Sequence, residues 1–397
     1  MPTTNTPVWD DHPGLDLPRL EGDVEADVCV VGLGGSGLAC VGELLGLGVR
    51  VVGIDAGPVG GGAAGRNGGF LLAGTYHFYH DAVERYGHGR ALRLYRRTLA
   101  EMDRMAAETP EAVRRVGSLR VASSPEEEDD CRAQLDAMRA DGLPAEPYGG
   151  PEGSGLLVPT DGAFQPLLRC RILARHAAER GARLFERSPA LSVSGTEVGT
   201  GRGRVRCGRV VVAVDGRLDA LLPELAGRVR TTRLQMLATA PAPEVNVPRP
   251  VYARWGYEYW QQLPDGRVAL GGFRDHGREE EWTHAAEPSA RVQARLERFL
   301  REGVGVRAPV THRWAASVGY TADGLPVLEE VRPGVFAAGG YSGTGNVVGA
   351  LCGRAAAQLA VRGTSEIADA FATDGKAPAA PGGATGAREG SCGGVSG

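Results

Sequence analysis

The sequence predicts an α/β fold in which a Rossmann-like nucleotide-binding domain is combined with a discontinuous second lobe built on an antiparallel or mixed β-sheet. Three observations predict it. The glycine pattern GLGGSG at 32–37 lies between two short apolar segments, and two further glycine-rich loops occupy 61–69 and 339–345. The segment 230–275 is rich in strand-forming residues. A chain of 397 residues is long enough for both lobes.

The first element is a strand–turn–helix–strand unit. We expect a strand at 27–31, a helix that runs to about Leu47 and ends at Gly48, and a second strand at 50–55. In such a unit the three glycines of a GxGxxG loop permit the turn, the approach of a pyrophosphate and close helix packing, and an acid after the second strand holds a ribose. The predicted dinucleotide contacts are Gly32, Gly34, Gly35, Ser36, Gly37 and Asp55.

The remaining elements follow from hydrophobic periodicity and end signals. We predict helices at 81–108, 125–142, 166–180 and 287–303, a long helix after the loop at 339–346, and strands at 118–122, 182–186, 207–216 and within 230–275. The Gly/Ala/Pro-rich tail at 374–397 is predicted to be disordered.

Composition excludes several classes of protein. The net charge is −4 with no basic block, which argues against a nucleic-acid partner. The N-terminus lacks the basic and apolar regions of a signal peptide, and no run of 18 apolar residues is present, so we expect no export signal and no membrane span. The seven cysteines show no metal spacing, which favours reduced thiols, a cytoplasmic location and no metal site.

NAD and FAD fit the first glycine loop equally well, and the stretch GGAAGRNGGFLL at 61–72 separates them. Its glycines are too many for nicotinamide binding alone, because only glycine lets the main chain contact a flat flavin ring. Here the sequence resembles the D-amino-acid-oxidase superfamily of FAD enzymes, in the branch of γ-glutamylputrescine oxidase, glycine oxidase and monomeric sarcosine oxidase. The resemblance covers most of residues 9–365 and rests on DVCVVGLGGSGL, GAAGRNGG, RWAASVGYTADGLPVL and FAAGGYSGTGN.

The resemblance implies which residues bind FAD and how the lobes divide. The FAD domain would comprise 25–80, 155–225 and 305–365, and the substrate domain 81–154 and 226–304. The planar guanidinium of Arg66 would donate hydrogen bonds to phosphate or flavin oxygens. The side-chain amide of Asn67 would bond the donor and acceptor groups at the edge of the flavin ring. The remaining expected contacts are Ala56, Ala64, Gly65, Gly68, Gly69, Ala190, Gly340, Tyr341, Ser342, Gly343, Thr344, Gly345 and Asn346.

The segment VYARWGYEYWQQL at 251–263 is the expected cover of the flavin. Read as one strand, its alternation places Tyr252, Arg254, Glu258 and Trp260 on one face and Trp255, Tyr257, Tyr259 and Gln261 on the other. We predict that Arg254, Tyr259, Trp260 and Arg313 act on the substrate, the aromatic residues as walls for an amine and the arginines as partners of a carboxylate. For each of them, core packing or a surface ion pair is the alternative role.

Three side chains of relatives in this superfamily are missing here, at two positions. Val318 stands where glycine-oxidase-like proteins carry a carboxylate-binding arginine, and no cysteine is present there to bond FAD, so the flavin is expected to be non-covalent. Ala269 stands at about the place of a lysine that helps O₂ accept electrons in some relatives, and the single lysine, Lys376, lies in the tail. Histidines of the stretch at 75–80, or His312, are alternatives.

The expected function is that of an FAD-dependent oxidase. It would move hydride from the carbon next to the nitrogen of an amine or an N-substituted amino acid, such as an N-alkylglycine, to flavin, and O₂ would give H₂O₂. The arginine bias suggests a GC-rich bacterium, where such an enzyme would serve small-molecule biosynthesis. The alternatives are an FAD-linked dehydrogenase with another acceptor, an NAD-dependent dehydrogenase and a nucleic-acid-binding protein. The sequence leaves the substrate and the oligomeric state open.

Overall fold

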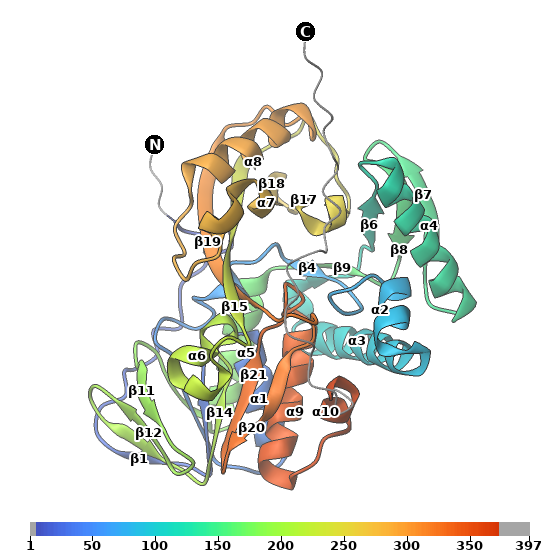
Figure 1. Ribbon diagram of the computed structural model, residues 1–397. Coiled ribbons are helices and arrows are strands. Elements are labelled where there is room, and N and C mark those ends of the chain that lie inside the picture. Colours follow the sequence, from blue (N-terminus) through green and yellow to red (C-terminus); the bar gives the residue numbers. More distant parts are fainter. Residues whose placement is uncertain (1–4, 373–397) are drawn as a thin grey trace.

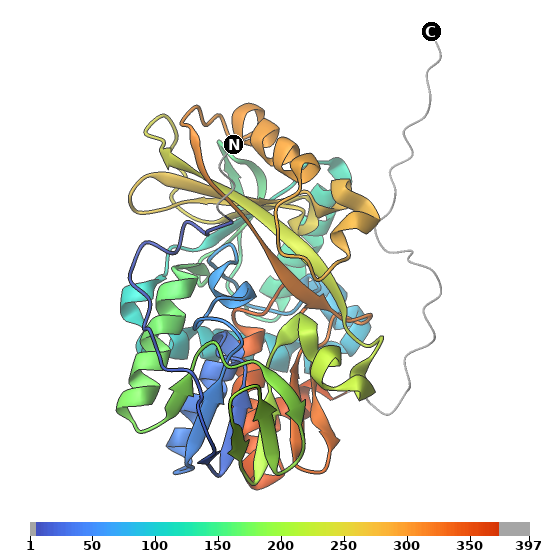
Figure 2. The ribbon, with the colours of Figure 1, turned by 90° about the vertical axis from the view of Figure 1, so that its left-hand side faces the viewer.

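The computed structural model of the chain describes residues 5–372 (Figure 1). The tail at 374–397, for which the sequence predicts disorder, lies outside the described residues, and so does Lys376. The architecture is the predicted α/β fold: one lobe contains a mainly parallel sheet covered by helices, and the other contains a larger mixed sheet that lies across it (Figure 2).

The first lobe is built on a six-stranded sheet. Five strands are parallel, and the edge strand β20 is antiparallel to β21. In order across the sheet the strands are β10 (Arg183–Phe185), β3 (Val51–Ile54), β2 (Val28–Val31), β14 (Arg209–Val212), β21 (Val335–Gly339) and β20 (Val327–Arg332). The central strand β2 reads VCVV and is buried on both sides, as a parallel strand between two layers must be.

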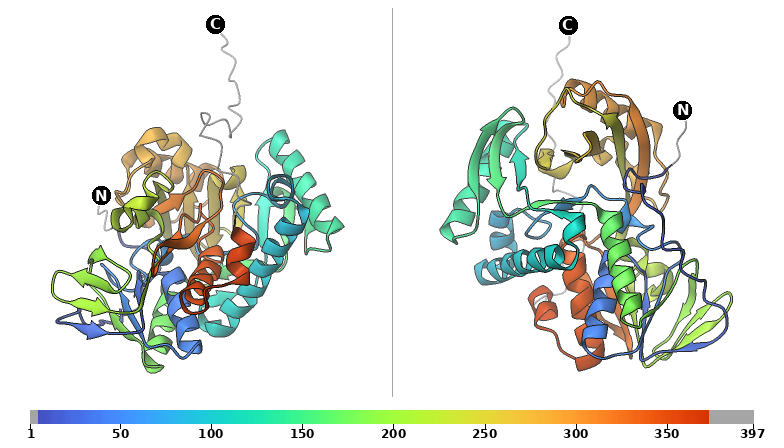
Figure 3. Two further views of the ribbon diagram at one scale, coloured as in Figure 1. Left: turned by 60° about the horizontal axis from the view of Figure 1, so that its bottom comes forward. Right: turned by 180° about the vertical axis from the view of Figure 1, so that it is seen from behind.

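Each face of this sheet has its own cover. Val28 and Val30 pack with α1 (Gly35–Gly46), α5 (Pro166–Glu179) and α9 (Val348–Arg362), which lie side by side in Figure 3. Cys29 and Val31 point to the other face and pack with a four-stranded sheet. That sheet has the order β1 (Val24–Glu25), β13 (Arg204–Arg206), β12 (Glu197–Thr200) and β11 (Ala190–Val193).

The second lobe is an eight-stranded mixed sheet in which β16 and β6 are the parallel pair. Its order is β19 (Val310–Tyr320), β15 (Arg230–Pro241), β18 (Arg267–Gly272), β17 (Glu258–Gln262), β16 (Val251–Ala253), β6 (Ser118–Val121), β8 (Gly153–Val158) and β7 (Glu146–Gly150). The long strands β15 and β19 cross above the first lobe, and helix α8 (Ala290–Glu302) lies on their far side (Figure 2).

Smaller elements join the lobes and close the fold. A three-stranded sheet connects them, with the order β4 (Phe70–Leu71), β9 (Gly162–Phe164) and β5 (Val113–Arg114). The remaining helices are α2 (Tyr79–Tyr86), α3 (His88–Glu108), α4 (Pro125–Ala140), α6 (Leu218–Leu221), α7 (Arg274–Gly277) and α10 (Glu366–Phe371). The predicted residue boundaries of the two domains stay a prediction.

Three predicted elements were wrong in detail. The single helix expected at 81–108 is two helices, because Gly87 between them adopts φ +81°. The strand expected at 207–216 ends at Val212, and Asp215 begins a 3₁₀ turn. The segment 251–263 is a hairpin rather than one strand: a 3₁₀ turn at Arg254–Gly256 separates β16 from β17, and φ is positive at all three turn residues. The expected division of its side chains between the two faces of one strand is therefore wrong.

Candidate active site

The N-terminus of α1 lies in the first glycine loop and no side chain caps it. A Cβ on Gly37 would lie 1.8 Å from the carbonyl oxygen of Gly32, and one on Gly32, whose φ is +104°, would lie 2.5 Å from the carbonyl oxygen of Ala213. The capping residue Gly34 offers no side chain, and the space beside Gly35 is open to 4 Å. The unpaired N–H groups and the positive end of the helix dipole therefore face open space, an arrangement that suits a phosphate.

Asp55 follows β3 and is bound to the backbone around this loop. Its two carboxylate oxygens accept hydrogen bonds from the N–H groups of Leu33, at 2.7 Å, and Gly57, at 2.8 Å. Burial raises the pKa of Asp55, and these two hydrogen bonds oppose the rise. The N–H of Ser188 donates to the carbonyl oxygen of Asp55 at 2.7 Å, so β11, which begins at Ala190, starts beside the end of β3. Ala56 is exposed at the same edge.

The second glycine loop is fixed by its arginine and its asparagine. Arg66 donates through Nε to the carbonyl oxygen of Ala315 at 2.8 Å and through Nη2 to the carbonyl oxygen of Asn5 at 2.6 Å. Asn67 donates to the carbonyl oxygens of Ala63 and Ala64 and accepts from the N–H of Gly69 at 2.8 Å. Arg66 therefore holds the loop against β19 and the N-terminal segment, and the Asn67 side chain, likewise expected at the flavin, holds the backbone of its own loop.

The third glycine loop, at 340–346, is held by a carboxylate that the sequence analysis missed. Asp215 accepts from the N–H groups of Gly340 at 2.9 Å and Tyr341 at 3.2 Å through one oxygen, and from Gly319 at 3.0 Å through the other. Burial raises the pKa of Asp215, against the effect of these amides. Its only sequence signal is an acid directly after a buried strand.

The three loops meet. The hydroxyl of Tyr341 donates to Ser36 Oγ at 2.7 Å, and Asn346 Nδ2 donates to Asn67 Oδ1 at 3.2 Å. A Cβ on Gly34 would lie 3.2 Å from that of Ala64. Ser342 Oγ lies beside the N–H of Thr321 at 3.2 Å, and Thr344 Oγ1 bonds its own loop. A helix N-terminus, a buried acid and two glycine loops in mutual contact fit a bound FAD, because backbone without Cβ atoms lets a flat ring approach.

One face of the eight-stranded sheet is turned toward these loops. A row of residues paired across neighbouring strands lies on it, namely Arg120, Tyr252, Tyr259, Gly271, Met236 and Trp314. Trp314 donates through Nε1 to the carbonyl oxygen of Arg66 at 2.7 Å. A Cβ on Gly68 would lie 3.3 Å from the Tyr259 ring, which also meets Phe70 edge-on at 5.8 Å. Tyr259 therefore lies against the second glycine loop, and its role as a cover of the flavin stays a prediction.

The other three residues predicted to act on the substrate lie elsewhere. Trp260 belongs to the opposite row of the sheet and packs edge-on against Phe299 of α8 at 5.4 Å, in an apolar core. Arg313 is on that face too and donates to Gln293 of α8 at 3.0 Å as well as to Glu297.

Arg254, in the hairpin turn, forms ion pairs with Glu258, at 2.9 Å, and with Asp275. The prediction placed Tyr252 and Trp260 on one face because it treated the segment as a single strand. The turn reverses the chain, so that Tyr252 instead pairs with Tyr259, and Val251 with Trp260. The structure thus gives Arg254, Trp260 and Arg313 roles in packing and ion pairing.

Several residues join Tyr259 on this inner face of the sheet, and of these the sequence analysis named Tyr257 and missed Arg274, Tyr320, Trp282 and Tyr76. The Arg274 guanidinium carbon lies over the rings of Tyr320 at 4.8 Å, Tyr257 at 5.1 Å and Trp282 at 5.7 Å. Tyr76 meets Tyr320 edge-on at 6.1 Å. We call Arg274 with these four rings the aromatic cage. No spacing predicts it, because β19, the hairpin turn, the loop before α2 and the segment after β18 each supply part.

The phenol groups of this face are neutral. Burial raises the pKa of Tyr252, Tyr259 and Tyr320. Burial opposes the charge of Arg274, but the interaction with Tyr320 and Tyr257 favours it, and its pKa lies above the ordinary arginine value. The face thus offers hydroxyl groups and two arginine cations, Arg274 and Arg120. Within residues 5–372 no group of three His, Cys, Asp or Glu side chains is placed to hold a metal ion.

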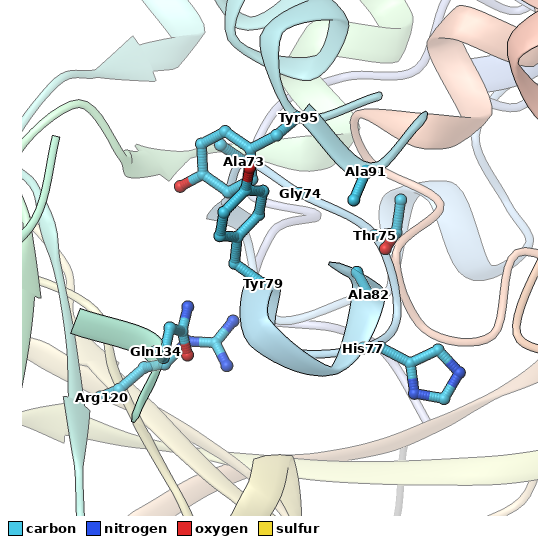
Figure 4. Close-up of a pocket in the computed structure, with 10 residues that line it drawn as sticks. All are labelled: Ala73, Gly74, Thr75, His77, Tyr79, Ala82, Ala91, Tyr95, Arg120 and Gln134. Carbon is cyan, nitrogen blue, oxygen red and sulfur yellow. The ribbon is translucent and has the colours of Figure 1, made fainter. Parts of the chain in front are cut away.

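A polar cavity adjoins this face beyond Tyr252. Figure 4 shows Arg120 and Gln134 reaching it from β6 and α4, opposite Thr75 and Tyr79. The Arg120 guanidinium lies 4.2 Å from the Phe78 ring and 5.4 Å from the Tyr252 ring. Arg120 Nη1, Gln134 Oε1 and Thr75 Oγ1 are buried without a hydrogen-bond partner among the described residues. The cavity is therefore lined by unused donors and acceptors.

Comparisons with known proteins agree with this geometry. The family model for FAD-dependent oxidoreductases named DAO matches residues 27–359. The chain is 30% identical to the probable oxidoreductase OrdL of Rhizobium meliloti (strain 1021), over 92% of this chain and 90% of that protein. It is 27% identical to the gamma-glutamylputrescine oxidoreductase of Escherichia coli (strain K12), over 89% and 87%.

The fold also matches solved structures. Glycine oxidase from Geobacillus kaustophilus superposes with a TM-score of 0.72 at 23% identity, covering 86% of this chain and 96% of that one. No helix within residues 5–372 is long and apolar enough to cross a membrane. The matched residues include all three glycine loops and the strands around them, and this chain therefore belongs to the DAO family of FAD-dependent oxidoreductases.

Proposed function

We propose that the enzyme oxidises the C–N bond of a small amine or N-substituted amino acid and passes the electrons to O₂. The observation that carries the proposal is the aromatic, phenol-lined face that meets the glycine loops at Gly68 and Gly343. FAD supplies a two-electron acceptor when bound, so the protein has to position the substrate and exclude water. The imine product is hydrolysed by water to a carbonyl compound and an amine. The names of the relatives, which include an oxidoreductase of gamma-glutamylputrescine and a glycine oxidase, support this substrate class.

The neutral phenols suit this role. A hydroxyl with a raised pKa remains a hydrogen-bond donor and acceptor at neutral pH, so it can orient an amine without taking its proton outright. Tyr259 and Tyr252, which are cross-strand partners, present their rings next to each other on the inner face. The rings also remove water from the space above the glycine loops, which strengthens every polar contact made there.

The FAD is proposed to be held without a covalent bond. The six cysteines of the described residues are all buried, in strands or helices or directly beside them. Val318, in β19, provides no thiol beside the third glycine loop. Precipitation of the holoenzyme with acid should therefore release all of the flavin into the supernatant. Buried free thiols also support a cytoplasmic enzyme.

An acceptor other than O₂ is the second candidate, and one observation favours it. Ala269 is fully buried in an apolar cluster with Met236, Ala238 and Trp314, so position 269 itself carries no cation to assist O₂. A slow reaction of the reduced enzyme with air, combined with fast reduction of a quinone or a dye, would favour a dehydrogenase.

An anaerobic visible spectrum tests the proposal. The purified holoenzyme is titrated with glycine, N-methylglycine, longer N-alkylglycines, putrescine and gamma-glutamylputrescine, and is then opened to air. We expect one class to bleach the flavin band near ~450 nm and air to restore it. If no amine bleaches a flavin that dithionite reduces normally, the proposal of C–N oxidation is wrong.

A further inference from the structure

The segment at 5–12 packs into the seam between the two lobes, although it precedes the residues that the family model matches, which begin at 27. Val8 is 1% exposed and Trp9 is 2% exposed. Both belong to one apolar cluster with Leu167 of α5 and Trp314 of β19. We call residues 5–12 the N-terminal strap. Its buried part lies beside the second glycine loop, which raises the question of what it does there.

Trp9 holds the second glycine loop through its indole ring. The indole Nε1 donates a hydrogen bond to the carbonyl oxygen of Asn67 at 2.7 Å. A Cβ on Gly69, whose φ is +68°, would lie 3.3 Å from the indole, so the ring packs directly on this glycine. The carbonyl oxygen of Trp9 accepts from the side chain of Gln165, just before α5, at 2.7 Å. A buried indole that is held by its own backbone therefore sets where the loop backbone lies.

Asn5 does the same for Arg66. Asn5 Oδ1 accepts from Arg66 Nη2 at 2.5 Å and from the N–H of Ala315 in β19 at 3.1 Å. Asn5 Nδ2 donates to the carbonyl oxygen of Ala286 at 2.8 Å, which fixes the orientation of the amide. Burial lowers the pKa of Arg66, so the guanidinium depends on hydrogen-bond acceptors to keep its charge inside the protein. Two of these acceptors, the backbone and side-chain oxygens of Asn5, come from the strap.

The strap is anchored to both lobes. Asp10 forms an ion pair with Arg171 of α5 at 2.6 Å, and Arg171 also donates to the carbonyl oxygen of His12 at 2.6 Å. Asp11 forms an ion pair with Arg267 of β18 at 3.2 Å. Partly exposed pairs of this kind add little stability one by one, but they fix the direction of the strap. The strap therefore ties the second glycine loop to a helix of the first lobe and to a strand of the second.

We propose that Trp9 and Asn5 are positioning residues of the FAD site, which hold the loop at 66–69 in the conformation that receives the flavin. Ordering a glycine-rich loop costs conformational entropy, and a loop that is ordered before FAD binds spares the cofactor that cost. Gly68 of the same loop contacts Tyr259, so a shift of the loop would also reach the active-site face. The inference goes beyond the proposed reaction, because it requires only the FAD of this family and holds for any substrate.

The test compares FAD binding and the surroundings of the bound flavin in two matched tryptophan variants. Trp9→Phe keeps an aromatic ring and removes the N–H that bonds Asn67. Trp260→Phe is the control, because Trp260 is also buried, at 6% exposed, but packs against Phe299 of α8. Dilution and ultrafiltration of the FAD-loaded proteins give the dissociation constant, and visible circular dichroism reports the surroundings of the flavin. We expect Trp9→Phe to weaken FAD binding about 10-fold and to change the visible signal, and Trp260→Phe to leave both as in the parent.

Asn5 provides an independent check with its own conservative variant. Asn5→Ala removes the oxygen that Arg66 and Ala315 share, and it should weaken FAD binding about 10-fold. Asn5→Asp keeps an oxygen at that place and should bind FAD within about threefold of the parent. An equal loss in the two variants would overturn the role given to this oxygen.

Melting of the FAD-saturated proteins separates positioning from packing. If Trp9→Phe and Trp260→Phe lower the melting temperature alike while FAD affinity and the visible signal stay those of the parent, the strap only packs and the inference is overturned. Unchanged FAD affinity in both Trp9→Phe and Asn5→Ala would overturn it as well. Should Trp9→Phe fail to fold, the two Asn5 variants decide alone. Because none of these measurements uses a substrate, their outcome is independent of whether the enzyme oxidises amines.

Discussion

Asp161 connects the loop after β4 to strand β6, and its protonation should change the free energy of unfolding. It is 4% exposed, just before β9. Ser118 Oγ of β6 donates to one oxygen at 2.7 Å, and the N–H of Ala73 donates to the other at 3.0 Å. Ala73 and Arg120, which lies two residues after Ser118, both line the polar cavity. The carboxyl group therefore holds the loop after β4 against the second lobe.

Burial raises the pKa of Asp161 to about 6 from its usual 3.8, although both hydrogen bonds and nearby Arg120 favour the charged form. A raised pKa in the folded state means that folding favours the protonated group. The stabilisation is complete below the unfolded pKa of 3.8 and is lost as the pH rises through about 6. A difference of roughly 2 pKa units corresponds to about 3 kcal/mol over the whole window, of which about 1 kcal/mol falls between pH 5 and 7.

The measurement is urea unfolding of the FAD-saturated enzyme at several pH values, with Asp161→Asn as the partner. Asparagine has nearly the same shape, accepts from Ala73 and does not titrate, so the difference between the two proteins isolates this carboxyl group. We expect the parent protein to lose about 1 kcal/mol relative to Asp161→Asn between pH 5 and 7. A difference that is independent of pH, or that grows in the opposite direction, would refute the reasoning.

Four other substitutions separate packing from function. Asp215→Asn replaces an acceptor oxygen by a donor against backbone N–H groups and should cost about 2–4 kcal/mol and release FAD, measured by thermal unfolding and flavin fluorescence. Gly353→Ala places a Cβ 2.0 Å from the Ser36 carbonyl oxygen between α1 and α9 and should cost about 1–3 kcal/mol by the same assays, while an unchanged melting temperature would disprove the tight contact. Trp260→Ala should lower stability by about 3–5 kcal/mol and leave the flavin spectrum with bound ligand unchanged, whereas Tyr259→Phe should change that spectrum and leave stability nearly intact.

The nucleotide-binding half was predictable because its function requires local sequence features. Gly37 is glycine because a Cβ there would lie 1.8 Å from the carbonyl oxygen of Gly32, and a contact between residues so close in the chain is visible as spacing in the sequence. The helix C-terminus at Gly48, with φ +76°, was found for the same reason. The family model then matched residues 27–359, as the resemblance implied.

The substrate half was less predictable because its geometry depends on a turn with no sequence signature. The residues Arg254 and Trp255 both adopt φ +50°, which neither side chain favours, and nothing in the sequence predicts a turn there except Gly256. One unrecognised reversal inverts the face of every later residue in the hairpin. Arg254 was thus expected to contact the substrate, whereas in the folded chain it forms ion pairs with Glu258 and Asp275.

The roles of Arg66 and Asn67 illustrate a different limit. Their residue types were expected in a loop beside the flavin, but a donor's partner depends on elements that arrive from elsewhere in the chain. Ala315, which accepts from Arg66, is 249 residues away, and Asn346, which donates to Asn67, is 279 residues away. Sequence spacing can locate such a loop without telling whether its side chains bind the ligand or the protein.

Arg254, in the hairpin turn, and Arg274, which begins α7, differ in how their charges are compensated. Both guanidinium groups lie within 6 Å of the Tyr257 ring, so proximity to the aromatic residues does not distinguish them. Ion pairing does: Arg254 forms ion pairs with two carboxylates, whereas Arg274 contacts the rings of Tyr320, Tyr257 and Trp282 and has Asp275 only as a nearby charge. An ion-paired arginine has little to gain from an added anion, because its charge is already compensated.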